Sequence, residues 1–166
     1  VAEFELTDSC KLVIQGGDIT RWFKDGHSDA IVNAANELML GGGGVDGAIH
    51  DAAGPDLYKA CKTLPLVAPR TRCPVGQARE TPAFRLPVRR IIHTVGPTYH
   101  RSTRMKAAAL LRDAYCNSLE LAREKGVKCI AFPAISCGIY GYPVYEGAEI
   151  ALRTVSENAA GFEEVH

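Results

Sequence analysis

Two side chains capable of acid–base chemistry lie four residues apart in a glycine-rich stretch of the sequence. The stretch reads GGGGVDGAIHDAAG from Gly41 to Gly54, and it contains Asp46 and His50. If the chain is helical from Val45 onward, positions i and i+4 share one face, so the carboxylate and the imidazole lie side by side. An aspartate in such a place can orient a water molecule, with the histidine setting its geometry. The spacing therefore predicts a carboxylate and an imidazole paired at the start of a helix, and orienting a water for hydrolysis is the hypothesis for their role.

The four glycines before Asp46 indicate that another group must approach bare backbone, because such a run loses much conformational entropy on folding. A glycine run that leads into a helix presents N–H groups and the positive end of the helix dipole, which is typical of a phosphate site. A second segment of this kind, PAISCGIYGYP, runs from Pro133 to Pro143 and also precedes a predicted helix. Two such loops predict a diphosphate ligand held between them at the C-terminal edge of a sheet.

These residues also admit other interpretations. The match of Gly42, Gly44 and Gly47 to the dinucleotide fingerprint is weak, because residues 34–40 separate the glycines from the preceding strand. The P-loop is excluded, since no Gly-Lys-Ser/Thr is present. A flexible surface loop stays open for the first glycine run. A carboxylate that only complements the helix dipole stays open for Asp46.

Short β-branched runs alternate with longer amphipathic segments, which predicts an α/β layered fold. The expected strands are Lys11–Gln15, Asp29–Asn33, Gly76–Thr81, Arg90–Val95 and Val127–Phe132, with another beginning at Glu163. The expected helices are Val45–Gly54, a further one opened by Pro55, Thr103–Lys125, and Val144–Ala160 with the inward stripe Ala148, Ala151, Val155 and Ala159. Residues 63–74 are expected to form a loop, and His93, inside an apolar strand, is expected to be a core histidine.

Composition excludes several classes of protein. The 166 residues carry 19 basic and 19 acidic side chains, so no net field is available to hold nucleic acid or an anionic membrane. No apolar run approaches the roughly 20 residues of a membrane span. The six cysteines form no C-x-x-C pair, which predicts reduced thiols in an intracellular protein of the cytoplasm or nucleus. No spacing fits a zinc site, so neither a metal nor a cofactor is expected.

Four motifs, taken together, resemble the macro domain family, specifically its MacroD-like branch of ADP-ribosyl hydrolases. They occur in the family's order as GDIT at 17–20, IVNAAN at 31–36, GGGGVDGAIH with AAG at 41–54, and PAIS with GIYGYP at 133–143. The resemblance implies one three-layer α/β/α domain over residues 1–166 with a central mixed β-sheet, lacking the family's last strand, which would lie beyond His166. It also implies metal-independent removal of ADP-ribose from Glu and Asp side chains of proteins, and deacetylation of O-acetyl-ADP-ribose.

The resemblance also assigns roles to individual residues. Asp46, His50 and Asn36 are expected to be catalytic, and Asp18 to accept the adenine amine. Asn33 is placed with the ligand-binding residues, although its position at the end of a strand also suits shaping the following turn. The full set expected to bind the ligand is Asp18, Ile19, Asn33, Asn36, Gly43, Gly44, Val45, Ser136, Cys137, Gly138, Ile139 and Tyr140.

Two features depart from the family's pattern, and two other functions stay open. The link formed by residues 21–28 is longer than usual, and Cys137 stands where many relatives carry threonine or serine. The expected partners are ADP-ribose, O-acetyl-ADP-ribose and mono-ADP-ribosylated proteins, and the chain is expected to be a monomer. A non-catalytic ADP-ribose reader or a phosphatase acting on ADP-ribose 1″-phosphate could use the same residues.

Overall fold

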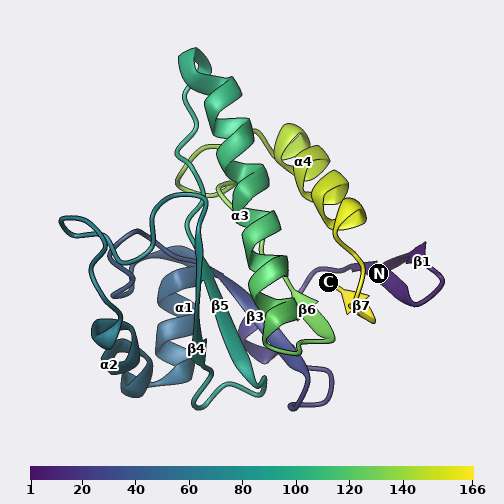
Figure 1. The fold of residues 1–166 in the computed structure, drawn as a ribbon, viewed down its shortest axis with the longest axis horizontal. Helices are drawn as coiled ribbons and strands as arrows, with labels where there is room; N and C mark the ends of the chain where they lie inside the picture. Colours follow the sequence, from purple (N-terminus) through teal and green to yellow (C-terminus); the bar gives the residue numbers. More distant parts are fainter.

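A seven-stranded mixed sheet forms the centre of the molecule, in the order β1-β2-β7-β6-β3-β5-β4 (Figure 1). The computed structural model describes all residues from Val1 to His166. The five inner strands run parallel, and the edge strands β1 and β4 are antiparallel to their neighbours. The strands are β1 (Ala2–Thr7), β2 (Cys10–Ile14), β3 (Asp29–Ala34), β4 (Ala78–Pro82), β5 (Arg90–Thr94), β6 (Cys129–Ala131) and β7 (Glu164–Val165).

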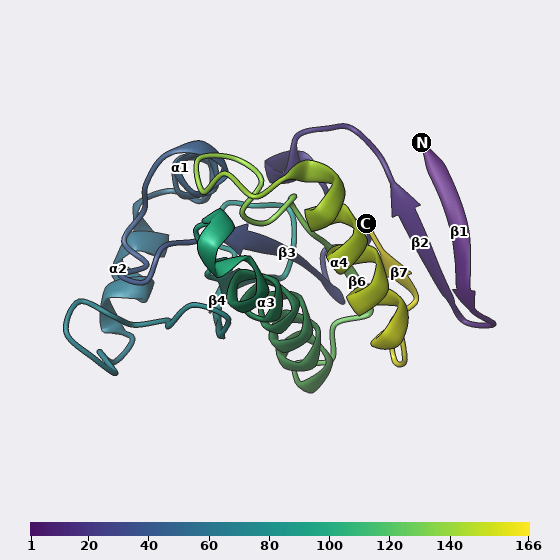
Figure 2. The ribbon, with the colours of Figure 1, turned by 90° about the horizontal axis from the view of Figure 1, so that it is seen from above.

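Helices cover both faces of the sheet, as Figure 2 shows from above. The α-helices are α1 (Gly44–Ala53), α2 (Pro55–Thr63), α3 (Arg104–Glu124) and α4 (Val144–Glu157), with short 3-10 helices η1 (Ile19–Arg21) and η2 (Arg101–Thr103). Successive residues of a strand point to opposite faces. Ile31 of β3 therefore joins the apolar core under α1 and α2, whereas Val32 joins the core under α3 and α4. None of the helices has the length and apolar character needed to cross a membrane.

The predicted three-layer α/β/α architecture with a mixed sheet is confirmed. Every predicted strand and helix is present within a few residues, and the segment beginning at Glu163 forms β7 between β2 and β6. The strand β1 was missed although Ala2, Phe4 and Leu6 alternate with polar residues, and most of its side chains are exposed because it is an edge strand. The expectation of a further strand concerns chain beyond His166 and stays a prediction.

The inward stripe predicted for α4 was partly wrong. Ala148 is exposed, and the buried residues of this helix are Gly147, Thr154 and Val155. The helix approaches the loop after β6 so closely that a Cβ on Gly147 would lie 2.9 Å from the sulfur of Cys137. A glycine therefore makes the inward contact at a place where the apolar pattern pointed to the neighbouring alanine.

One buried carboxylate holds the long link of residues 21–28. Asp29 is completely buried, and its Oδ2 accepts three successive backbone N–H groups, those of residues 24–26, at 2.8 to 3.1 Å. Its Oδ1 accepts the N–H of Arg89 at 3.0 Å. The single side chain thus satisfies four backbone donors and ties the link to the segment that leads into β5.

The Asp29→Ala variant should lower the free energy of unfolding by about 3 kcal/mol, because the buried donors lose an ionised acceptor. Urea denaturation measures the change. Asp56→Ala is the control, since Asp56 makes only an exposed ion pair with Lys59 at 3.4 Å, and its loss should cost less than about 1 kcal/mol. Equal losses in the two variants would contradict the role assigned to Asp29.

Candidate active site

A cavity of about 440 Å³ opens at the carboxyl end of β3. Its wall comes from two glycine-rich segments, residues 42–46 and residues 133–140, together with Asn36. Parallel strands place their carboxyl ends at one edge of a sheet, so the loops after β3 and β6 meet there. The sequence expectation that the two loops face each other is therefore confirmed.

A second cavity of about 380 Å³ adjoins the first, and the two share Val45, Pro133 and Ala134 as lining residues. Asp18 and Ile19 line this second cavity. The two cavities form one elongated groove across the edge of the sheet. Its length suits a ligand with several units better than a single small ion.

The N-terminus of α1 faces the first cavity with bare backbone. The helix begins at Gly44, its N-cap is Gly43, and no side chain caps its first N–H groups. Gly44 has φ 59, a left-handed conformation that strongly favours glycine. Uncapped N–H groups at the positive end of a helix dipole attract an anion.

Close packing of the loop around α1 also requires glycine at positions that the sequence analysis did not assign to the site. A Cβ on Gly47 would lie 2.5 Å from the carbonyl oxygen of Gly42. A Cβ on Gly42 would lie 3.1 Å from Asp46 Oδ2 and 3.2 Å from Asn36 Nδ2. Gly42 thus lies against both polar groups, and their convergence depends on the absence of a side chain there. The regular glycine spacing in GGGGVDG was the signal that could have identified both positions.

Asp46 is the buried charge of the site. It is 4% exposed, and its Oδ1 accepts the amide N–H of Asn33 at 2.8 Å. Its Oδ2 has no hydrogen-bond partner, although the residue lines the first cavity. Burial raises the pKa of Asp46, and the hydrogen bond from Asn33 and the charge of His50 oppose this shift. The carboxylate is therefore a stronger base than an exposed aspartate.

His50 lies beside Asp46, as the i, i+4 spacing predicted. Its Nε2 is 3.6 Å from Asp46 Oδ1, which is longer than a direct hydrogen bond. The imidazole does not line the cavity that Asp46 faces. It lines a neighbouring cavity of about 450 Å³, and a Cβ on Gly41 would lie 3.7 Å from the ring. His50 thus supports the glycine loop and the carboxylate from behind.

Of the two asparagines of NAAN, Asn36 takes the turn-shaping role that was expected of Asn33. Asn36 shapes the turn, because its Oδ1 accepts the N–H of Met39 at 3.0 Å and its Nδ2 donates to the carbonyl of Gly41 at 3.1 Å. Asn36 also lines the first cavity. Asn33 does not shape the turn or line that cavity, since it is fully buried within β3 and bonds Asp46. The expectation that Asn33 shapes the turn is corrected, because strand alternation turns it under α1.

The loop after β6 turns Ser136, Gly138, Ile139 and Tyr140 to the cavity, but not Cys137. Ser136 has φ 64, and this left-handed residue reverses the direction of the chain. Cys137 consequently faces the apolar space under α4, where burial raises the pKa of its thiol. Its side chain therefore does not face the ligand cavity, and its place among the ligand-binding residues stays a prediction. A half-buried thiol with a raised pKa is also a poor nucleophile.

At the other end of the groove Asp18 is a turn aspartate. Its Oδ1 accepts the N–H of Thr20 at 2.9 Å and the hydroxyl of Thr20 at 2.7 Å, and these bonds lower the pKa of Asp18. The same residue lines the second cavity. Trp22 and His166, which the sequence analysis did not assign, line it as well, with ring centroids 5.0 Å apart.

The remaining polar side chains do not assemble a metal centre. No group of three or more His, Cys, Asp and Glu side chains could hold a metal ion, and all six cysteines are free thiols. The chemistry available in the groove is therefore that of a buried carboxylate, an amide and many backbone N–H groups.

Comparison with known proteins shows close relatives. The family profile described as Macro domain matches residues 32–151. An O-acetyl-ADP-ribose deacetylase of Citrobacter rodentium is 57% identical over 129 residues, covering 78% of this chain and 71% of that protein. A macro domain-containing protein of Ralstonia nicotianae is 55% identical over 137 residues, covering 82% of this chain and 76% of that protein. A solved macrodomain of Oceanobacillus iheyensis with ADP has a TM-score of 0.86 at 42% identity, covering 99% of this chain and 85% of that one.

The buried charge predicts a pH-dependent gain in stability for Asp46→Asn. Because the pKa of Asp46 is raised in the folded state from 3.8, its ionisation disfavours folding at pH 7 and costs nothing below about pH 3.8. The amide variant should therefore melt at a higher temperature than the parent at pH 7, and the gain should disappear as the pH falls toward 3.8. Thermal melts between pH 4 and 7 measure this effect.

The control for this measurement is Asp51→Asn. Asp51 lies on the same helix but is exposed, so its replacement should give no gain that grows with pH. A melting temperature for Asp46→Asn that is equal to or below that of the parent at pH 7 would contradict the buried-charge interpretation.

Proposed function

The chain belongs to the macro domain family, and we propose that it binds ADP-ribose and hydrolyses esters of ADP-ribose. The proposed substrates are O-acetyl-ADP-ribose and proteins with ADP-ribose on Glu or Asp side chains. One observation carries the catalytic part of the proposal: Asp46 lines the cavity walled by two glycine-rich loops, and its buried Oδ2 has no hydrogen-bond partner in the protein. A carboxylate beside an anion site opposes binding, so its presence there supports a chemical role.

The proposed pose follows the groove from end to end. Adenine occupies the second cavity, where Asp18 keeps its Oδ2 free to accept an exocyclic amine. The diphosphate accepts hydrogen bonds from the uncapped N-terminus of α1 and from the loop of residues 136–140. The distal ribose then reaches Asn36 and Asp46, with Tyr140 beside it.

The proposed reaction is addition of water to the ester carbonyl. Oδ2 of Asp46 takes a proton from the water while the water oxygen bonds to the acyl carbon. The tetrahedral intermediate then expels the ribose oxygen, which takes the proton back from Asp46, so one ester and one water give one carboxylic acid and free ADP-ribose. The raised pKa of Asp46 supports this role, because a general base works best when its pKa is near the working pH.

Other side chains support the carboxylate in this mechanism. Asn36 uses one amide N–H for the carbonyl of Gly41, and the second is available to the ribose or the water. His50 holds the glycine loop and lies 3.6 Å from Asp46, so it acts by setting geometry. No metal takes part in the proposed step. The free cysteines support an intracellular location as part of the proposal.

Asp46→Ala should lower the single-turnover rate of acetate release from O-acetyl-ADP-ribose by about 10²-fold or more, as expected for loss of a positioned acid–base group. Glutamate-ADP-ribosylated protein should show the same loss. The affinity for ADP-ribose, measured by calorimetry, should change little or rise, because the carboxylate repels the diphosphate. Asp51→Ala, one turn further along α1 and exposed, should keep both values within about twofold.

The opposite outcomes are specific. Equal losses of rate and affinity in Asp46→Ala would make Asp46 a binding group. A parent chain that binds ADP-ribose but releases neither acetate nor ADP-ribose would be a reader.

The anion site itself is tested by a pair of matched glycine variants, Gly44→Ala and Gly126→Ala. Both glycines have positive φ, 59 and 75, and a Cβ at either would meet no protein atom within 4 Å. Both variants should lose about 1 kcal/mol of stability from backbone strain. Only Gly44→Ala should lose at least about tenfold in ADP-ribose affinity, because only its Cβ enters the phosphate cavity. Equal affinities in the two variants would contradict the proposed phosphate contact.

A further inference from the structure

A chain of buried polar side chains continues behind Asp46 into the sheet. Asn33 of β3 and His93 of β5 are directly paired in the parallel sheet, and both are completely buried. Asn33 Nδ2 lies 2.8 Å from Asp46 Oδ1 and 3.1 Å from His93 Nδ1. His93 Nε2 lies 2.8 Å from the hydroxyl of Thr81 on β4. The chain therefore runs from the cavity across three strands to the edge of the sheet.

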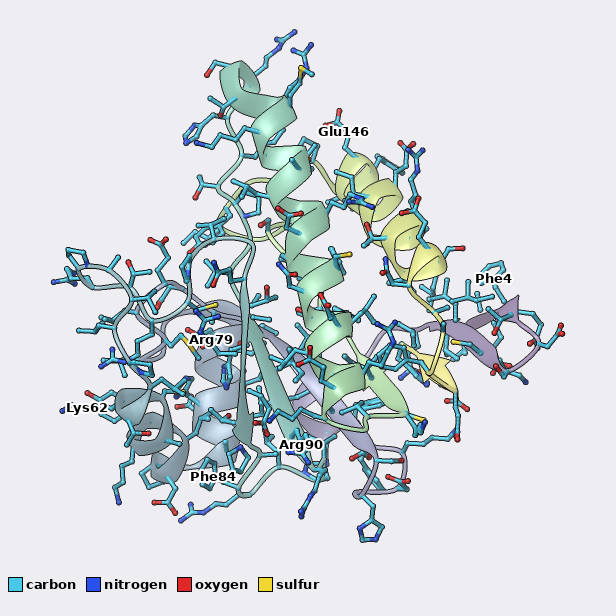
Figure 3. All side chains as sticks on the ribbon, viewed as in Figure 1. Phe4, Lys62, Arg79, Phe84, Arg90 and Glu146 are labelled. Carbon is cyan, nitrogen blue, oxygen red and sulfur yellow. The ribbon has the colours of Figure 1, made fainter.

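The setting of this chain is otherwise apolar. The sheet face toward α1 and α2 carries Ile31 and Ile91 beside the polar residues. Arg79, labelled in Figure 3, marks the place on β4 that is opposite His93 in the strand register, and Thr81 lies two residues further along the same face. Buried polar groups cost stability unless all of them are hydrogen-bonded, and Asn33 Oδ1 is buried without a partner. A core under stability constraints alone would therefore be apolar here.

The ionised state of Asp46 determines the direction of every hydrogen bond in the chain. A carboxylate only accepts, so Asn33 must turn its amide nitrogen toward Asp46. The second N–H of that nitrogen then points at His93 Nδ1, which must accept it. His93 is therefore neutral with its proton on Nε2, and that N–H donates to the hydroxyl of Thr81. Burial, together with the charge of His50, lowers the pKa of His93 to about 3, in agreement with a neutral ring.

We propose that His93 and Thr81 are positioning residues for the reaction, which hold the Asp46 carboxylate in its working orientation through Asn33. The inference rests on the proposed function of Asp46. His93 was expected to be a core histidine, and it is one, but its hydrogen bond with Asn33 links it to the residue that donates to Asp46. Without the acceptor at Thr81, the Nε2–H of His93 is buried and unpaired. The ring then gains by changing tautomer or rotating, which turns the Asn33 amide away and leaves Asp46 without its donor.

The test uses Thr81→Val, Thr81→Ser and a matched control. Valine has the shape of threonine without the hydroxyl, and serine restores the hydroxyl. Thr94→Val is the control, because Thr94 follows His93 directly and is equally buried. Its side chain points to the opposite face of the sheet. There its hydroxyl donates to the carbonyl of Gln77 at 2.8 Å and lies 3.4 Å from the carbonyl of Ala114. Thr81→Val and Thr94→Val each remove one buried hydroxyl from neighbouring strands, whereas Thr81→Ser keeps the hydroxyl.

The kinetic readout is the separation of kcat from KM for acetate release. Thr81→Val should lower kcat about tenfold, the scale of a lost supporting hydrogen bond, with KM within about twofold. Thr81→Ser should return kcat to within about twofold of the parent. Thr94→Val should lose stability but keep kcat. Equal kcat values for parent and Thr81→Val, or equal losses for Thr81→Val and Thr94→Val, would overturn the inference.

A second readout does not depend on turnover. The NMR signals of the His93 ring nitrogens should identify the Nε2–H tautomer in the parent, and Thr81→Val should change them. The pKa of Asp46, measured from its carboxyl carbon, should rise in Thr81→Val and stay unchanged in Thr94→Val. The other titratable groups near Asp46 are His50 on α1, Cys61 on α2 and Tyr140 on the facing loop, and all three variants leave them in place.

The two readouts separate failure of the inference from failure of the proposed function. If the parent releases no acetate, the proposed hydrolysis is wrong. The positioning chain is then judged by the NMR data alone. An unchanged Asp46 pKa and an unchanged His93 tautomer in Thr81→Val would overturn the inference whether or not the parent is active.

Discussion

The site depends on one close contact, the approach of the glycine loop to the first turn of α1. A Cβ on Gly47 would lie 2.5 Å from the carbonyl of Gly42, so the helix and the loop can be this close only with glycine in place. This approach leaves the first N–H groups of the helix uncapped at the cavity. It also brings Asn36 and Asp46 together at Gly42, which lies against both polar groups. The uncapped helix N-terminus and the buried carboxylate therefore share one structural cause.

The same contact has an energetic consequence, because it buries an ionised carboxylate. Asp46 Oδ2 has no hydrogen-bond partner, and burial raises the pKa of Asp46. The rest of the structure offsets this cost from behind, through the amide of Asn33 and the buried histidine to which it is bonded. A site that costs stability and is supported by a dedicated hydrogen-bonded chain is the pattern expected where function, and not packing, decides the residues.

The sheet supplies the frame for both effects. Parallel pairing of β3 with β5 and β6 places Asn33 beside His93 and brings the loops after β3 and β6 to one edge. Asp29, at the start of β3, holds the long link of residues 21–28 through backbone N–H groups. That link connects residues 18–20, which line the second cavity, to β3. The buried carboxylate of Asp29 therefore helps to hold the end of the groove that contains Asp18.

Much of this protein was determined by the sequence alone. The alternating apolar runs predicted the α/β layers, and the i, i+4 spacing placed Asp46 beside His50, because both signals depend on local geometry. The tertiary structure alone decided which way Asn33 and Cys137 point, since strand alternation and the left-handed Ser136 turn them away from the cavity. It also decided that His93 and Thr81 are connected to Asp46 through Asn33, because strand register brings together segments that are distant in the chain. Sequence patterns carry the local geometry of one element, but the pairing of distant elements is a property of the folded sheet.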